Sequence, residues 1–383
     1  MDLELSDDQE LFRETTARFI DARCPLPEVR RLADEPVAHD PAVTRDAGEL
    51  GWFALFVPEE FGGGSVSGSP LRDAVIVAEE RGRFVQPGPF VATNVVACAL
   101  AERGTREQQE RYLPALASAE LTASWAISDR RGIPEAGPVR ASAREGGFVL
   151  EGTAGLVSEG GAAGAFLVTA ADGEGGGVTQ FVVPSDAPGV QVVTLGGLDL
   201  TRRFVDVRFD RVEVDADAVL GAAGAAQPDV DRQLDVAVTL NLAESVGAMR
   251  RLVEVTVDYA KARIAFGRPI GSFQALKHIL ADVSQWTELS TAALDAATDA
   301  VADRRPTASE IVSIAKAYTG DAGSNVAQMC LQAHGGIGFT WEHDLHFYLR
   351  RLEADRVLFG DPFWHRERIC RIHGLGTHGG NAR

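Results

Sequence analysis

Apolar residues recur at helical spacing through the first 120 residues of the chain. Two capping boxes, in which Ser or Thr precedes Gln by three residues, mark helix starts behind Ser6 and Thr105. Between them the periodicity predicts helices over 41–53 and 70–84, the second opening on a Ser-Pro pair. Residues 1–120 are therefore predicted to form an N-terminal α-helical domain.

The spacing changes near residue 121, where apolar and polar positions begin to alternate as in β-strands. Over 204–209 the alternation predicts one apolar face, made of Val205, Val207 and Phe209, and one polar face, made of Asp206, Arg208 and Asp210. Further strands are expected at 149–153, 165–168 and 180–183, and a turn is expected in the Gly-rich stretch 172–177. We predict an antiparallel β domain over 121–222.

Helical spacing returns after a linker rich in Ala, Gly and Pro. One apolar stripe, long for a globular helix, is made of Val238, Leu242, Val246, Met249, Val253 and Ala260. Further helices are predicted over 272–304, 307–334 and 343–356, with a tail helix over 361–372. Residues 223–383 should form a C-terminal four-helix bundle, and the whole chain an α+β fold.

The stretch from Tyr259 to Asp282 interrupts the bundle pattern with a turn. Gly and Pro at 267, 269 and 271 break the helix because neither fits cheaply in a helix interior. Arg263 and Arg268 lie at the shoulders of this turn, and arginines beside exposed backbone amides suit a phosphate. The alternative is a plain helical hairpin with surface arginines, since helix ends commonly carry them.

Composition and charge narrow the possible functions. A net charge of -18 over 383 residues argues against nucleic acid and anionic membranes as partners, because both require basic patches. Four scattered cysteines indicate neither a disulfide framework nor a zinc site, and the acidic N-terminus does not fit a signal peptide. The longest uncharged run, 84–101, contains two prolines and does not fit a membrane span. We expect a cytoplasmic enzyme.

Two blocks of sequence resemble the acyl-CoA dehydrogenase signature. The first contains Arg263, Phe266-Gly267, Pro269-Ile270-Gly271 and Phe273-Gln274, and the second runs from Gln332 to Thr340. The resemblance covers nearly the whole chain and implies the three-domain flavoprotein fold, an acyl-CoA substrate, an electron-transfer partner and FAD shared between two subunits. It implies that the ADP part of the FAD is bound by Arg263, Phe266, Gln274, Gln332, Gly335 and Gly336.

The positions that face the flavin ring in the family have changed. The usual Thr-Glu-Pro and Gly-Ser-Asp sequence is replaced by Ile127-Ser128-Asp129 followed by Arg130 to Pro134. The usual Gly-Thr-Lys, aromatic, Ile-Thr becomes 152–158, in which Ser158 retains a hydrogen-bonding group for flavin. Leu156 cannot stack on the ring as an aromatic would.

The catalytic carboxylate is also missing from both positions that the family uses. By resemblance, these positions fall on Phe359 and on Ala237. Asp361 and Asp235 each lie two residues away, and Asp361 is the better substitute. The run Glu342-His343-Asp344-Leu345-His346 has histidines at i and i+3, but a polar helix start explains it better than a metal site, so we expect no metal.

Three hypotheses follow. The chain is a base-lacking subunit that pairs with a related, base-bearing chain in an α2β2 assembly, as in family members that act on steroid-derived thioesters. Alternatively, it is a self-sufficient homo-oligomer that uses Asp361. As a third possibility, it is a non-catalytic acyl-CoA-binding or interaction protein that keeps only the fold.

Overall fold

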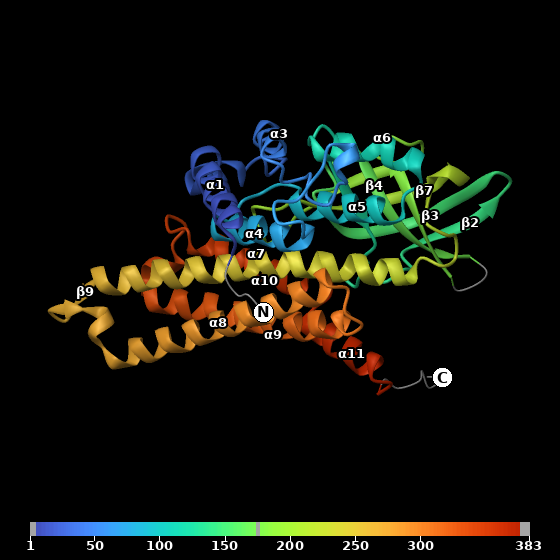
Figure 1. Ribbon diagram of the computed structural model, residues 1–383. Helices are drawn as coiled ribbons and strands as arrows, with labels where there is room; N and C mark the ends of the chain where they lie inside the picture. The colour runs from blue at the N-terminus through green and yellow to red at the C-terminus, as the bar shows by residue number, and fades with distance from the viewer. Residues whose placement is uncertain (1–4, 174–176, 376–383) are drawn as a thin grey trace.

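The computed structural model describes residues 5–173 and 177–375 and has two layers (Figure 1). The N-terminal helices and the β-sheet lie side by side above a bundle of long helices. The N-terminal helices are α1 (Asp7–Arg23), α2 (Leu26–Leu32), α3 (Pro41–Glu49), α4 (Pro70–Arg83), α5 (Phe90–Arg103) and α6 (Arg106–Ala117). Among the described residues, no helix is both long and apolar enough to cross a membrane. The predicted fold class is confirmed.

Both predicted capping boxes are present at the helix starts. The Ser6 hydroxyl accepts a hydrogen bond from the Gln9 amide at 3.3 Å, and the Gln9 side chain accepts one from the Ser6 amide at 3.2 Å. Thr105 and Gln108 repeat this arrangement before α6. The helix predicted over 41–53 was too long, because α3 ends at Glu49 and Gly51 takes a positive φ of 81°.

The β domain is a mixed sheet in the order β6-β7-β3-β2-β4-β5-β8, with β1 paired to β4. Most neighbours are antiparallel, but β4 runs parallel to both β1 and β2, which corrects the all-antiparallel expectation. The strands are β1 (Ala123–Ala126), β2 (Val139–Arg144), β3 (Gly147–Ser158), β4 (Ala165–Asp172), β5 (Val178–Pro184), β6 (Val190–Leu195), β7 (Phe204–Asp215) and β8 (Val219–Leu220). Part of the predicted 172–177 turn lies outside the described residues.

Strand β7 has the predicted apolar face, and Val205, Val207 and Phe209 are buried in the core of the sheet. On the opposite face Arg208 and Asp210 are exposed as expected. Asp206 is the exception, since it is only 2% exposed and its carboxylate pairs with Arg130 at 2.5 Å. The polar face is therefore covered at this one position by an ion pair that links two distant segments.

The bundle consists of α7 (Gln227–Ala262), α8 (Gln274–Ala302), α9 (Ala308–His334) and α10 (Leu345–Val357), with α11 (Pro362–Ile372) as the tail. Helix α7 lies between the upper layer and the other long helices (Figure 1). A short 3-10 turn, Ile270–Ser272, precedes α8. This helix therefore begins two residues later than predicted, at Gln274 instead of Ser272.

Two glycines allow α4 and α7 to cross closely. A Cβ atom added to Gly82 would lie 2.0 Å from the Glu244 carbonyl oxygen, and one added to Gly247 would lie 1.9 Å from that of Glu79. Real Cβ atoms do not approach carbonyl oxygens this closely, so both positions require glycine. This crossing joins the N-terminal domain to the bundle.

We expect Gly247→Ala to destabilise the protein by about 1–3 kcal/mol, because the added methyl group must push two helix backbones apart. Gly196→Ala is the matched control, since no atom lies within 4 Å of its added Cβ, and it should change stability by less than about 0.5 kcal/mol. Urea unfolding measures both changes. Equal effects at the two positions would contradict the steric explanation.

Candidate functional site

The first signature block forms the far tip of the bundle. After α7 the chain makes a small hairpin, β9 (Ile264–Ala265) and β10 (Arg268–Pro269), with Phe266 and Gly267 at its turn. Both turn residues have positive φ, at 52° and 80°. Phe266 is 95% exposed, although an exposed phenyl ring and a left-handed backbone are both unfavourable. A residue that keeps both unfavourable features is typical of one that contacts another molecule.

The second signature block lies at the same end of the bundle. The Tyr259 ring near the end of α7 stacks on the His334 ring at the end of α9, with centroids 4.4 Å apart. Gln332, close to the end of α9, is exposed, and so is Gly336 just after it. Gly335 has φ 64° and ψ -143°, a conformation that a side chain disfavours. The structure thus brings the two predicted ADP-binding blocks to one end of the molecule.

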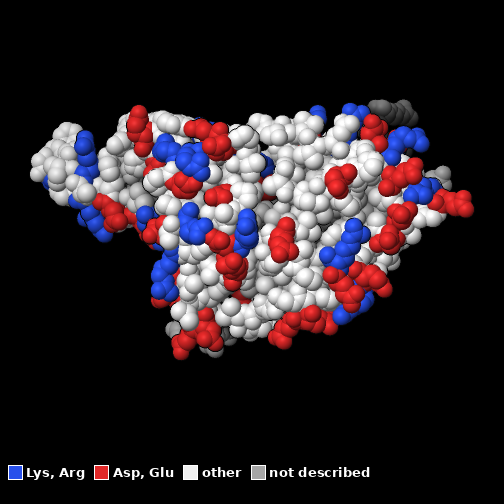
Figure 2. Space-filling view, turned by 90° about the horizontal axis from the view of Figure 1, so that it is seen from above, with Lys and Arg blue, Asp and Glu red and all other residues white. Residues whose placement is uncertain are grey.

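The surface of this tip is apolar and basic. Arg263 and Gln274 are exposed, and the Arg268 guanidinium lies 4.2 Å from the centroid of the Phe273 ring. In Figure 2 the end that carries the hairpin is mostly uncharged, with basic side chains near its base. The exposed apolar residues here are Ile264, Phe266, Ile337, Phe339 and Trp341. An anionic, partly aromatic ligand and a second protein surface would both fit this tip.

Ser158 and Phe359, which the family resemblance places at the flavin and at the base, line a small chamber between the sheet and the bundle, away from the tip. Ser158 ends β3 and lines the chamber together with Phe359, whose backbone has φ 61°. The Phe359 ring is 8% exposed and packs 6.5 Å from that of Trp125, and its carbonyl lies 3.1 Å from Nε2 of His365. The chamber measures about 20 Å³, which is enough for one water molecule.

The two family base positions and the two aspartates weighed as substitutes all have structural roles in the fold. Phe359 closes the chamber, and Ala237 is fully buried in α7. The Asp235 carboxylate pairs with Arg368 at 2.9 Å and accepts from Ser309 at 2.6 Å, while its burial raises its pKa. The Asp361 carboxylate caps α11 by accepting from the Trp364 amide at 2.7 Å. Among the described residues neither aspartate lines the chamber.

A buried ion cluster lies beside the chamber and was not predicted from the sequence. Arg202, in the loop before β7, pairs with Glu244 of α7 and Asp355 of α10. Arg81 of α4 lies 3.3 Å from the Glu244 carboxylate. A second pair joins Arg351 of α10 to Asp199 at 2.8 Å. The only signal in the sequence was the presence of charged residues within apolar helical runs. This signal does not show which charged residues pair with one another.

Burial and neighbouring charges together shift the pKa values of the cluster. Desolvation raises the pKa of Glu244, but Arg202, Arg81 and Arg351 outweigh it and bring the pKa below its usual value. Lys316 of α9 is 1% exposed and donates to Asn241 Oδ1 at 2.6 Å and to the Asp355 carbonyl. Its burial lowers its pKa to about 7, against the attraction of Asp355.

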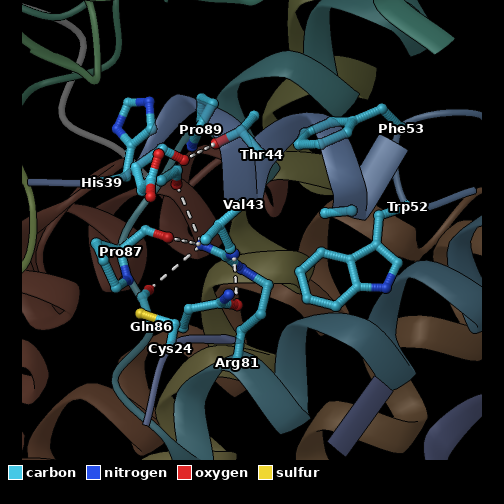
Figure 3. Close-up of a pocket in the computed structure, with 13 residues that line it drawn as sticks. Cys24, His39, Val43, Thr44, Trp52, Phe53, Arg81, Gln86, Pro87 and Pro89 are labelled. Carbon is cyan, nitrogen blue, oxygen red and sulfur yellow. Dashed lines mark hydrogen bonds between the residues drawn. The ribbon is translucent and has the colours of Figure 1, made fainter. Parts of the chain in front are cut away.

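A second small cavity lies beside the 86–89 segment (Figure 3). Gly88 and Pro89 line both spaces. Arg81 extends into this cavity and donates to the Gln86 side chain at 2.9 Å and to the Gly88 carbonyl at 3.1 Å (Figure 3). This cavity also measures about 20 Å³. Neither space approaches the few hundred Å³ that a cofactor-sized group requires.

An open cleft of about 590 Å³ lies between the β domain and α11. Arg368 and Arg371 flank the Trp364 ring there, with their guanidinium carbons 5.8 and 5.4 Å from its centroid. The Trp364 indole donates to Glu135 at 2.9 Å, and the Arg368 guanidinium donates to the Ser309 hydroxyl at 3.2 Å and lies 3.8 Å from the Asp231 carboxylate. Both arginines are already paired with carboxylates, Arg368 with Asp235 at 2.9 Å and Arg371 with Glu135 at 3.2 Å, so an anionic ligand would have to compete with these pairs. Among the described residues, no cluster of three or more His, Cys, Asp or Glu side chains is placed to hold a metal.

Comparison with known proteins identifies the class. The profiles for "Acyl-CoA dehydrogenase, N-terminal domain" and "Acyl-CoA dehydrogenase, C-terminal domain" match residues 6–120 and 229–372. Acyl-CoA dehydrogenase IpdE2 of Mycolicibacterium smegmatis is 31% identical over 369 residues, covering 96% of this chain and 98% of that protein. The chain therefore belongs to the acyl-CoA dehydrogenase family.

Solved structures agree with this assignment. The crystal structure of the ChsE4-ChsE5 complex from Mycobacterium tuberculosis has a TM-score of 0.89 at 27% identity, covering 98% of this chain and 99% of that one. The Tcur3481-Tcur3483 steroid ACAD variant has a TM-score of 0.87 at 26% identity, covering 97% and 99%. Structures at 20% and 23% identity, solved with FADH2 and with FAD, share the fold.

Lys316 provides a test of the buried cluster. Its pKa is lower in the folded than in the unfolded protein, so protonation favours unfolding, and stability should rise with pH above about 7. The charged groups around it are Asp355, Arg202, Asp361 and Arg356. Between pH 7 and 8.5 this contribution reaches at most about 2 kcal/mol, at roughly 1.4 kcal/mol per pH unit. Lys316→Met should remove it.

The measurement is urea unfolding of wild type and Lys316→Met at both pH values. Lys261→Met, at an exposed lysine, is the control and should keep the wild-type pH dependence. If wild type and Lys316→Met change stability in parallel, Lys316 keeps an ordinary pKa in the folded protein.

Proposed function

We propose that this chain is the non-catalytic subunit of an α2β2 acyl-CoA dehydrogenase, in which it holds the ADP part of a FAD whose ring and catalytic base belong to a related chain. The observation that carries the proposal is the contrast between its two half-sites. The base position is occupied by Phe359 in a chamber of about 20 Å³, whereas the ADP-binding positions are exposed together at the tip.

The two half-sites fit FAD unequally. At the tip, Arg263 is an exposed cation for the pyrophosphate, and Gln274 and Gln332 are exposed amides for the adenosine. At the chamber, Ser158 keeps a hydroxyl group, but the space beside it is far smaller than an isoalloxazine ring. We therefore assign the chain a role in binding and assembly, and no step of dehydrogenation.

In the assembly, FAD would accept the hydride that leaves the acyl-CoA thioester, and an electron-transfer partner would then reoxidise it. This chain's residues would bind the diphosphate, orient the adenosine and cover part of the partner subunit. The buried Cys24, Cys98 and Cys330 are consistent with action in the cytoplasm. The two-chain relatives ChsE4-ChsE5 and Tcur3481-Tcur3483 support pairing, and the description of the latter as a steroid ACAD supports a steroid-derived thioester.

A second candidate function rests on the cleft beside α11. Its Trp364 ring and Arg371, whose side chain is 51% exposed although it pairs with Glu135, could bind the nucleotide end of an acyl-CoA without any chemistry at the thioester. This is the non-catalytic acyl-CoA-binding hypothesis, and it is compatible with a pairing role. The self-sufficient homo-oligomer is favoured less, because the Asp361 carboxylate already caps a helix.

Arg263→Ala should lower the FAD content of the co-expressed assembly severalfold without unfolding it. The change removes a charge-assisted contact to the pyrophosphate and leaves the bundle core intact, because Arg263 is exposed. Flavin absorbance per mole of protein measures the loss, and thermal unfolding tests the fold. Lys261→Ala, which removes an exposed cation two residues away, should retain full flavin. Unchanged flavin in Arg263→Ala would remove the tip from the FAD site.

The chain purified alone should show only trace dehydrogenation of acyl-CoA with an artificial electron acceptor, since a positioned base contributes roughly a hundred- to ten-thousand-fold in rate. Co-expression with a base-bearing related chain should produce both yellow colour and activity.

Asp361→Asn distinguishes this proposal from a self-sufficient enzyme. Asparagine caps a helix about as well as aspartate, so the variant should keep both its fold and the activity of the assembly. Brisk turnover by the chain alone, abolished by Asp361→Asn, would overturn the pairing proposal and identify Asp361 as the base. Phe359→Glu alone should gain little activity, because no hydride acceptor is aligned in the closed chamber.

A further inference from the structure

A charged side chain forms part of the chamber wall. Arg202 lines the chamber together with Glu244, Asn241, Ser158 and Phe359. Its guanidinium pairs with the Glu244 carboxylate on one side and the Asp355 carboxylate on the other. Arg202 is only 7% exposed, so this bridge lies inside the protein. By the family resemblance, the space between the positions of Ser158 and Phe359 is where flavin and thioester meet.

Six side chains of the cluster balance in formal charge, before Lys316 is counted. Three guanidinium groups face three carboxylates, and all six residues are at most 7% exposed: Arg81, Arg202, Arg351, Asp199, Glu244 and Asp355. A seventh member, Lys316, joins the cluster through Asn241 and the Asp355 carbonyl. Desolvating an ion is costly, so buried ions persist only when their partners compensate them. Each carboxylate here has a cationic partner within the protein, while Nη1 of Arg351 is buried without a hydrogen-bond partner.

The members also come from all three parts of the chain. Arg81 belongs to the N-terminal helices, Arg202 and Asp199 to a loop of the β domain, and Glu244 and Asp355 to the bundle. Arg351 adds a hydrogen bond to Thr201 in the same loop. These contacts meet where the three parts join, next to the chamber.

We propose that Arg202 is a built-in plug, whose ion pairs keep the chamber closed and join the three domains in the absence of any cofactor. This inference deepens the proposed function, on which it rests, by identifying what replaces a flavin ring in a subunit that does not hold one. It assigns Arg202 a positioning role, with no contact to substrate. The fold of this subunit should consequently be independent of flavin.

The decisive experiment is chemical rescue of Arg202→Ala in the full-length chain. Removing the guanidinium leaves two buried carboxylates short of a partner, so the melting temperature should fall by about 10 °C. Methylguanidinium at millimolar concentration should restore part of this loss by entering the opened space. It should not stabilise wild type or Arg208→Ala, in which an exposed arginine of β7 is removed.

A charge-balanced variant keeps the proposal testable if the single variant does not fold. Arg202→Ala combined with Asp355→Asn removes one cation and one anion, leaving the Arg81–Glu244 and Arg351–Asp199 pairs intact. The melting temperature of this double variant should be higher than that of Arg202→Ala. Two results would show that Arg202 does not hold the cluster. One is a double variant that is no more stable than the single variant, and the other is a single variant with the melting temperature of wild type.

The plug has a separate test in the wild-type chain. Lumiflavin, the bare isoalloxazine ring, should show no saturable binding to wild type by fluorescence titration and should not raise its melting temperature. Saturable binding accompanied by a rise in melting temperature would overturn the plug. That result would leave the pairing proposal standing, because pairing is judged by turnover with a base-bearing partner and by FAD retention at the tip.

Discussion

The middle of α7 is buried on all sides, and the rest of the structure depends on this constraint. From Gln233 to Met249 every residue of this helix is buried, although the segment contains several polar side chains. A buried polar group is costly unless it is hydrogen-bonded. Each neighbour of α7 therefore has to supply a partner at a fixed height along the helix. The packing of the three domains follows from this requirement as well as from apolar contact.

The partners come from different elements. Gln233 exchanges side-chain hydrogen bonds with Gln180 of β5 at 2.6 and 2.9 Å. Asp235 meets residues of α9 and α11, while Asn241 bonds to Asp355 of α10 at 2.9 Å. Glu244 faces the arginines of α4 and of the β6–β7 loop. One helix thus sets the position of the sheet, the N-terminal domain and the remaining bundle, and the chamber wall is a by-product of that arrangement.

Local signals in the sequence predicted much of this fold. The Ser6 box and the glycine turn at Gly267 depend on residues a few positions apart, and both lie where they were expected. The two signature blocks, to which the family resemblance assigned ADP binding, lie together at the tip. Asp206 and Arg202 could not be placed in this way, since their partners are distant in the sequence, by 153 residues for Arg202 and Asp355. Alternation shows which face a side chain takes, and says nothing about what covers that face.

Under the proposed pairing, the exposed tip has a consequence for how the chain is made. A chain released without its counterpart would present Phe266 and Phe339 to solvent, 95% and 73% exposed, and unpartnered apolar surface attracts chaperones, proteases and self-association. Surplus copies would then be removed while assembled copies persist. The exposed tip would thereby adjust the stoichiometry of the two proteins. The amount of this chain would match the amount of its counterpart even when the two are synthesised unequally.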